Sequence, residues 1–174
     1  MILIEPTIQA RFGRSLRQRA LAAFLREASP LAGLRGDVSV LLTGDTHIRR
    51  LNREFRRKDR PTDVLSFPAP APLNGHAAPA GDLAISVETA ARQARDFAHP
   101  LATELRILLL HGLLHLGGYD HESDSGQMAR KEAALRRRFG LDAGLIERAA
   151  APTQARPARK KAAAPPAPPR RSRP

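Results

Sequence analysis

The sequence predicts an α/β (α+β) fold: a single domain in which a small mixed sheet of about four strands is packed by about five helices. Two observations predict this class. Short runs rich in apolar and β-branched residues alternate with longer segments in which apolar residues recur at helical spacing. Two of the strand candidates also follow each other without a helix between them, and this adjacency favours a mixed sheet over an all-parallel one.

The strands are predicted at residues 2–4, 38–42, 63–67 and 81–86. Each run is short and apolar, and turn-forming residues or a helical pattern follow it. The third run is stopped by Pro68 and further prolines. The Ala-, Pro- and Gly-rich stretch that continues to Pro79 predicts a loop of the kind found at the rims of active sites.

The first two helices are predicted at residues 13–28 and after the turn Thr43-Gly44-Asp45. In the first helix, apolar residues recur every three or four positions until Ser29-Pro30. In the second, the residues expected to face inward are Ile48, Leu51 and Phe55, and those expected to face outward are Arg49, Arg50 and Arg53. Pro61 and the polar residues before it should end this helix.

Three further helices are predicted at residues 87–97, 101–116 and 123–139. The middle one is apolar on nearly all sides, so it should lie buried at the centre of the fold. A pair of glycines follows it and predicts its end. The last helix should begin near Asp124 and Gln127, which are spaced like a capping box.

The chain divides into a predicted domain of residues 1–148 and a basic tail of residues 149–174. The tail consists almost wholly of Ala, Pro, Arg and Lys, so it has no apolar periodicity and is predicted to be disordered. Of the net charge of +12, seven charges fall in the last 24 residues, which contain no acid, and about +5 remains on the preceding 150. This distribution suits a polyanionic partner such as nucleic acid, although basic tails often bind nothing specific.

The composition excludes several classes of site. The absence of cysteine removes disulfides, thiolate metal sites, iron–sulfur clusters and cysteine nucleophiles. The most apolar run, residues 107–116, is too short to span a bilayer. The first residues lack the basic segment and long apolar stretch of a signal peptide. A cytoplasmic protein is therefore expected.

Three of the six histidines fall within eleven residues, and their spacing predicts a metal site. His111 and His115 lie four residues apart in the predicted central helix, so their side chains share one face. The glycine pair lets the chain reverse after the helix, which brings His121 toward the other two. Three imidazoles with no evident fourth protein ligand are typical of a catalytic zinc ion rather than a structural one. The remaining histidines are expected at the surface or in turns: His47, His76 and His99.

The spacing H-x-x-x-H-x-x-G-x-x-H also occurs in the metzincin metalloproteases. Those enzymes need a glutamate immediately after the first histidine as their general base. Here Gly112 stands in that place, and glycine can neither accept nor donate a proton. Peptide hydrolysis therefore ranks below other hydrolytic reactions.

The motif at residues 111–121 matches H-G-x-L-H-L-x-G-Y-D-H at every fixed position and so resembles the hallmark of the YbeY family of bacterial endoribonucleases. Residues 51–68 and Gly81-Asp82-Leu83 are similar to that family as well, and the resemblance covers roughly residues 1–148. Arg57 stands where the family commonly has a small residue, and the basic tail is not part of the pattern. The resemblance implies a zinc-dependent, single-strand-specific endoribonuclease and rRNA maturation factor. It would act at the 3′ end of small-subunit (16S) rRNA and in ribosome quality control.

The resemblance also implies roles for single residues and partners. The three histidines would hold one zinc ion per chain. Arg56 would hold a phosphate or the negative charge of the transition state, for which the guanidinium fork is well suited. Asp82 would line the substrate cleft. Asp120, beside His121, is the nearest acidic candidate for a general base or, as we favour, for orienting a ligand. The implied partners are rRNA or other single-stranded RNA, the small ribosomal subunit and a ribosome-associated GTPase.

Several alternatives stay open on the sequence. A zinc ion could lower the pKa of a water molecule or polarise a phosphoryl oxygen, and the attacking group could be water or a ribose 2′-hydroxyl. The chain could also be a ribosome-assembly binding factor with a mainly structural zinc, or a zinc hydrolase of another substrate class. Without the resemblance, Arg56 would be interpreted as an ion-pairing surface residue, and Asp82 fits a helix-entry role nearly as well.

Overall fold

The computed structural model describes residues 1–70, 79–121 and 123–141. The strands are β1 (Ile2–Ile4), β2 (Val38–Thr43), β3 (Val64–Pro68) and β4 (Gly81–Ser86). The α-helices are α1 (Pro6–Phe12), α2 (Gln18–Leu31), α3 (Asp45–Arg56), α4 (Val87–Asp96), α5 (Leu101–Leu116) and α6 (Gln127–Phe139), and the 3₁₀ helix η1 (Gly13–Leu16) lies between α1 and α2. The predicted basic tail, the end of the predicted domain and most of the predicted proline-rich loop lie outside the described residues.

The four strands form one mixed sheet in the order β1-β2-β4-β3. β1, β2 and β4 run parallel, and the pairing of β1 with β2 places Ile2 opposite Val40. β3 runs antiparallel to β4, with Leu65 opposite Ala84. The predicted α/β fold with a small mixed sheet is confirmed, and β3 forms one edge of that sheet.

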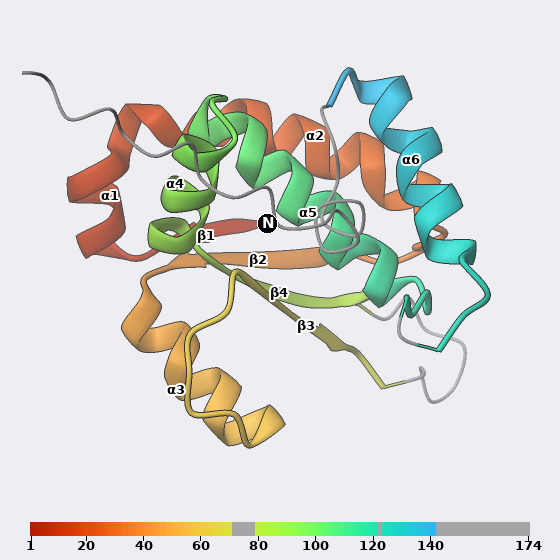
Figure 1. The fold of residues 1–174 in the computed structure, drawn as a ribbon, viewed down its shortest axis with the longest axis horizontal. Helices are drawn as coiled ribbons and strands as arrows, with labels where there is room; N and C mark the ends of the chain where they lie inside the picture. Colours follow the sequence, from red (N-terminus) through yellow and green to blue (C-terminus); the bar gives the residue numbers. More distant parts are fainter. Residues whose placement is uncertain (71–78, 122, 142–174) are drawn as a thin grey trace, which may run out of the picture.

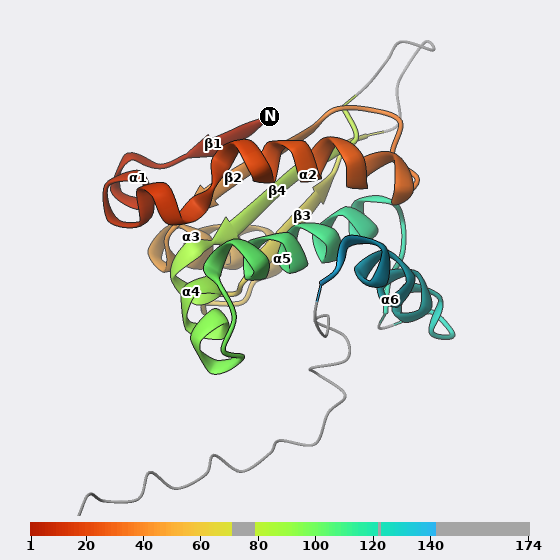
Figure 2. The ribbon, with the colours of Figure 1, turned by 90° about the horizontal axis from the view of Figure 1, so that it is seen from above.

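Different helices cover the two faces of the sheet (Figures 1 and 2). In Figure 1, α3 lies below the sheet, whereas α2 and α5 lie above it. Successive residues of a strand point to opposite faces, so neighbours in β4 belong to different layers. Leu83 and Ile85 join the leucines of α5 in the main core, whereas Ala84 packs with Ile48 of α3 and Leu65 of β3 in a smaller cluster.

α5 is the central helix, as the sequence predicts, and it has the predicted bounds. It packs against β3, β4, α2, α4 and α6, and most of its leucines are buried. A helix enclosed in this way also encloses its polar side chains: Glu104 is fully buried and His111 is 5% exposed. Buried polar groups need partners, so these residues are tied to particular neighbours. Within the described part of the chain, no helix combines the length and the apolar character needed to cross a bilayer.

The N-terminal helical region differs from the prediction of one helix over residues 13–28. The chain instead forms α1, η1 and α2 in succession. α1 begins at Pro6, a residue suited to a first helical position because the N–H it lacks would have no helical partner there. It buries only Ile8, too weak an apolar pattern to be predicted. The left-handed φ of 47° at Arg17 separates η1 from α2, which ends one residue after Pro30.

The prediction that Phe55 faces the core is wrong, since this side chain is 59% exposed. The smaller cluster under the sheet covers the earlier turns of α3, so the last turn is left at the surface. There the Phe55 ring meets the ring of Phe67 of β3 edge-on, with 5.1 Å between their centroids.

α6 begins four residues later than the predicted start at residue 123. Gly126, immediately before it, has a left-handed φ of 78°, which no helix can include. Asp124 nevertheless serves the start of the helix, because its carboxylate accepts hydrogen bonds from the backbone N–H groups of Gln127 and Met128.

Candidate metal centre

The C-terminal end of α5 and the loop after it bring the three predicted histidines together. His111 and His115 lie one helical turn apart, and their Nε2 atoms are 3.1 Å from each other. The ring centroid of His121 lies 5.4 Å from that of His111 and 5.3 Å from that of His115. One ring nitrogen of each residue can be taken so that all three atoms lie within 4.8 Å of one another. These three side chains form a group that can hold a metal ion.

A Schellman turn at the end of α5 carries His121 back toward the helix. The backbone N–H of Gly118 donates to the carbonyl oxygen of His115 at 3.0 Å, and that of Tyr119 donates to Leu114 at 3.1 Å. These two bonds define the Schellman motif. Its C′ position requires a left-handed residue, and Gly118 has a φ of 85°. The local sequence therefore determines where the third histidine goes.

The preceding glycine is needed for a steric reason. A Cβ atom on Gly117 would lie 2.4 Å from the carbonyl oxygen of Ala32 at the end of α2. Because that neighbour is backbone, any side chain at position 117 would push the end of α5 away from the end of α2. The two glycines thus have separate tasks, one in close packing and one in the turn.

The separation of the first two histidines is close to that of two ligands of a tetrahedral zinc ion. Two Zn–N bonds of about 2.0–2.1 Å at a tetrahedral angle separate the two nitrogens by about 3.3–3.4 Å. The 3.1 Å between the Nε2 atoms of His111 and His115 is close to that separation. Burial, and then the neighbouring His111 and His121, lower the pKa of His115 to about 4. Its imidazole is therefore neutral at pH 7, which is the form that binds metals.

A carboxylate on α6 orients the first histidine. Glu132 is 1% exposed, and its Oε1 lies 3.1 Å from Nδ1 of His111. A carboxylate in this place keeps the proton on Nδ1 and leaves Nε2 free to face the other two rings. Histidine ligands of metals almost always donate their other ring N–H to such a partner. Sequence reasoning missed Glu132, although a signal existed: it lies on the buried face of α6, between Met128 and Leu135.

Replacing Glu132 with glutamine should weaken zinc binding about 10- to 100-fold, because the amide keeps the shape but not the charge that orients His111. Competition with a chelator of known zinc affinity measures this change. Glu54→Gln, at an exposed carboxylate on α3, is the matched control and should leave the affinity unchanged. Equal zinc affinity of wild type and Glu132→Gln would contradict the orienting role.

Gly112, the residue after the first histidine, faces the sheet. A Cβ atom on it would lie 2.8 Å from Cδ2 of Leu83 and 3.3 Å from Cγ2 of Val64. Ser66 of β3 also donates a hydrogen bond to its carbonyl oxygen, at 3.3 Å. The position that metzincin peptidases fill with glutamate therefore packs tightly on strand side chains here. This packing gives a structural reason, besides the missing carboxylate, for ranking peptide hydrolysis low.

Arg56 and Asp82 lie on the α3 side of the sheet, whereas α5 and its two histidines lie on the other side. Arg56 is the last residue of α3 and is exposed. Asp82 is exposed on β4, and because its neighbour Leu83 faces α5, the Asp82 side chain faces the opposite way. β3, the edge strand, contacts α3 on one side of the sheet and α5 on the other.

Asp120 lies beside the group of histidines and belongs to the turn that carries His121. Its carboxylate accepts a hydrogen bond from Oγ of Ser123 at 2.7 Å. Its negative charge raises the pKa of His115, whereas burial lowers that pKa.

Two of the remaining histidines, His47 and His99, make contacts within the fold. His99 lies in the turn between α4 and α5, as predicted, but its side chain is only 7% exposed and lies with Nε2 2.9 Å from the fully buried carboxylate of Glu104. His47 is half-buried and pairs with Glu5. His76 lies outside the described residues.

Known proteins resemble this chain over most of its length. The family model for Endoribonuclease YbeY matches residues 5–140. The endoribonuclease YbeY of Koribacter versatilis (strain Ellin345) is 49% identical over 144 residues, which cover 83% of this chain and 91% of that protein. That of Solibacter usitatus (strain Ellin6076) is 48% identical over 134 residues, or 77% and 87% of the two chains. A solution structure of a Thermotoga maritima protein matches with a TM-score of 0.51 at 28% identity, covering 92% of this chain and 100% of that one.

Proposed function

The chain belongs to the endoribonuclease YbeY family and is an endoribonuclease, and we propose that it uses zinc to cleave single-stranded RNA. The proposed substrate is the 3′ end of 16S rRNA in the small ribosomal subunit, and a part in ribosome quality control is proposed with it, as the family resemblance implies. A ribosome-associated GTPase is the proposed protein partner, and the cytoplasm, where ribosomes are, is the proposed compartment.

One observation carries the proposal: one ring nitrogen each of His111, His115 and His121 can be taken so that all three lie within 4.8 Å of one another. Among the described residues, no further His, Asp, Glu or Cys joins this group. Three protein ligands and one vacant position are typical of catalytic zinc sites. Such an ion, when bound, would act as a Lewis acid that polarises a phosphoryl oxygen or lowers the pKa of a water molecule. The chain itself contributes the carboxylate of Glu132, which orients His111, and the turn that returns His121.

The other proposed roles rest on exposure and on neighbours. Arg56 is exposed and makes no hydrogen bond or ion pair with another described residue, so its guanidinium is available to a phosphate. We assign it the binding of the scissile phosphate. Asp82 faces the same side of the sheet and would line the substrate path. The bond from Ser123 to Asp120 supports an orienting role for this carboxylate rather than a role as general base.

Removal of the metal tests the proposal on the wild-type protein. Dialysis against a chelator should abolish cleavage of a labelled single-stranded RNA, and one equivalent of Zn²⁺ per chain should restore it, because the ion would act as the Lewis acid of the reaction. Metal analysis by mass spectrometry and gels of the digested RNA measure the two quantities on the same samples. Full cleavage by metal-free protein would exclude the mechanism, and equally fast cleavage of a duplex would exclude the strand preference.

A further inference from the structure

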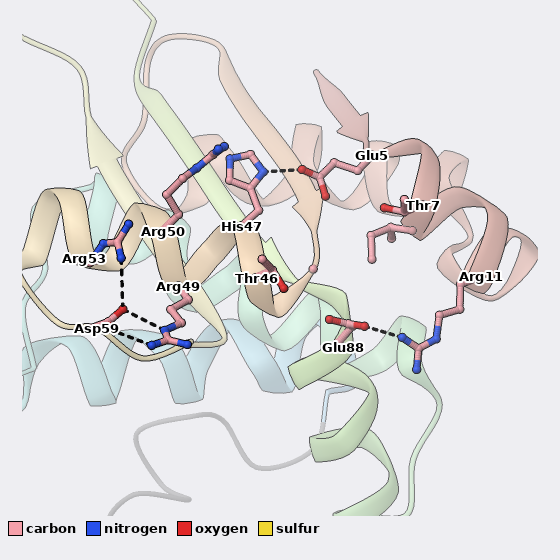
Figure 3. Close-up of a pocket in the computed structure, with 12 residues that line it drawn as sticks. Glu5, Thr7, Arg11, Thr46, His47, Arg49, Arg50, Arg53, Asp59 and Glu88 are labelled. Atoms are coloured by element: carbon pink, nitrogen blue, oxygen red, sulfur yellow. Dashed lines mark hydrogen bonds and ion pairs between the residues drawn. The ribbon is translucent and has the colours of Figure 1, made fainter.

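A pocket of about 720 Å³ lies where α1, α3 and the start of α4 meet (Figure 3). None of the three histidines of the metal group lines it. Its charged lining consists of four arginines, three carboxylates and one histidine, mostly from α1 and α3. The lining therefore has more arginines than carboxylates, so not all of its arginines can be paired with a carboxylate of the pocket.

All three carboxylates of the pocket are engaged. The pairs are Glu5 with His47, Glu88 with Arg11 and Asp59 with Arg49. Asp59 accepts from Arg49 through both oxygens, from Nε at 2.9 Å and from Nη2 at 2.8 Å. This bidentate contact lowers the pKa of Asp59, so Asp59 stays ionised and paired with Arg49 near neutral pH.

The other two arginines keep positive charge that the pocket does not neutralise. Arg50 makes no hydrogen bond or ion pair with any residue that the structure describes, and Figure 3 draws none for it. Arg53 comes within 4.0 Å of Asp59, whose two oxygens already accept from Arg49. The Arg53 side chain is 64% exposed, so a ligand can reach it. The α3 wall of the pocket thus offers two guanidinium groups to an anion.

These two arginines continue a row that ends at Arg56. Residues three apart on a helix are neighbours on its surface, so Arg50, Arg53 and Arg56 follow one another along α3. At 1.5 Å per residue the row is about 9 Å long. Guanidinium groups bind phosphate oxygens through two hydrogen bonds each, and a row of them suits successive phosphates of one strand better than an isolated phosphate.

An exposed aromatic ring beside this row favours RNA over an acidic peptide. Phe55 precedes Arg56 in the chain, is 59% exposed, and is held in place by the edge-on contact with Phe67. Exposed aromatic rings beside basic side chains are the means by which proteins bind single-stranded nucleic acid, because each base can stack on a ring.

From these contacts we infer that Arg50 and Arg53 form a second RNA-binding site, which holds phosphates of the single-stranded substrate adjacent to the segment that is cut. The inference rests on the proposed function and extends it: the substrate passes Arg56 and continues along α3 into the pocket.

The test compares Arg50→Gln/Arg53→Gln with Arg19→Gln/Arg26→Gln. The control pair removes the same charge from exposed positions on α2, which packs on the other face of the sheet. Fluorescence anisotropy with a 20-nucleotide single-stranded RNA gives Kd over a range of salt concentrations, and gels check that the RNA is intact. At low salt, loss of two phosphate contacts should raise Kd about tenfold and reduce the slope of log Kd against log salt by about 1.4. In cleavage assays KM should rise about as much while kcat and zinc content stay at the wild-type values.

The outcomes separate this inference from the proposed function. If both variants bind and cleave RNA alike, the second site is excluded while the endoribonuclease function stands. If wild type fails to cleave but only the Arg50/Arg53 variant loses RNA affinity, the function fails while the binding site stands. Weakened binding of a polyglutamate peptide with unchanged RNA binding would overturn the inference and identify the pocket as a site for an acidic protein. A shifted melting temperature of the Arg50/Arg53 variant together with a lower kcat would also overturn it, by showing damage to the fold.

Discussion

The His115→Ala variant is expected to bind no zinc and to cleave RNA at least about 10³-fold more slowly than wild type. His115 lies between the other two ligands in the chain, and its Nε2 is 3.1 Å from that of His111. Without it, two imidazoles remain, too few to hold an ion in an open tetrahedral site. Metal analysis of the purified variant and single-turnover digestion of labelled single-stranded RNA measure the two losses.

The control for this variant is His76→Ala, which truncates a histidine outside the motif in the same way and should keep both zinc and activity. Circular dichroism should give the same helix content for all three proteins. Zinc retained by His115→Ala at one equivalent per chain would show that this imidazole is not a ligand. Activity retained without zinc would refute the metal-dependent mechanism itself.

The Arg56→Glu variant should keep one zinc per chain and lose about 10²- to 10³-fold in kcat. The guanidinium is proposed to stabilise charge that develops on the phosphate, and a carboxylate in its place repels that charge. Arg56→Lys should fall between wild type and Arg56→Glu, because lysine keeps the charge but lacks the planar fork. Steady-state kinetics on a single-stranded RNA, beside metal analysis, distinguish the three proteins.

Arg26→Glu makes the same change of charge on α2 and should leave kcat unchanged. Unchanged turnover of Arg56→Glu would remove Arg56 from the site. Loss of zinc together with activity would show instead that the substitution acts through the fold.

The sequence predicted the fold best where a single strong pattern decides the structure. The bounds of α5 follow from its leucines and from the glycines after it, and those glycines also determine the turn that returns His121. β4 and β1 also have the predicted bounds, because each is a short apolar run whose end is marked by a turn or by the start of a helix. The approach of the three histidines was predictable because helical spacing and one local turn suffice to produce it.

Contacts between segments far apart in the chain could not be predicted in this way. Glu132 meets His111 only because α6 packs against α5, and nothing within α6 identifies its partner. Phe55 has an apolar position in the helical pattern but lies past the cluster that α3 covers, so its exposure depends on where the sheet ends. The pairing of His99 with Glu104 likewise needs the angle between α4 and α5. In each case the sequence pattern indicates where a residue lies in its element, whereas tertiary packing determines what its side chain contacts.

The position of β3 at the margin of the sheet bears on solubility. A marginal strand leaves one row of backbone donors and acceptors without a neighbour, and such rows recruit strands of other molecules into aggregates. β3 counters this in its composition: it is five residues long, it ends at Pro68, and Pro61 and Pro70 stand close to either end. Proline has no N–H to offer an incoming strand. This edge, which packs against the helix that carries His111 and His115, can therefore stay open to a substrate while strand pairing with a second copy of the chain is disfavoured.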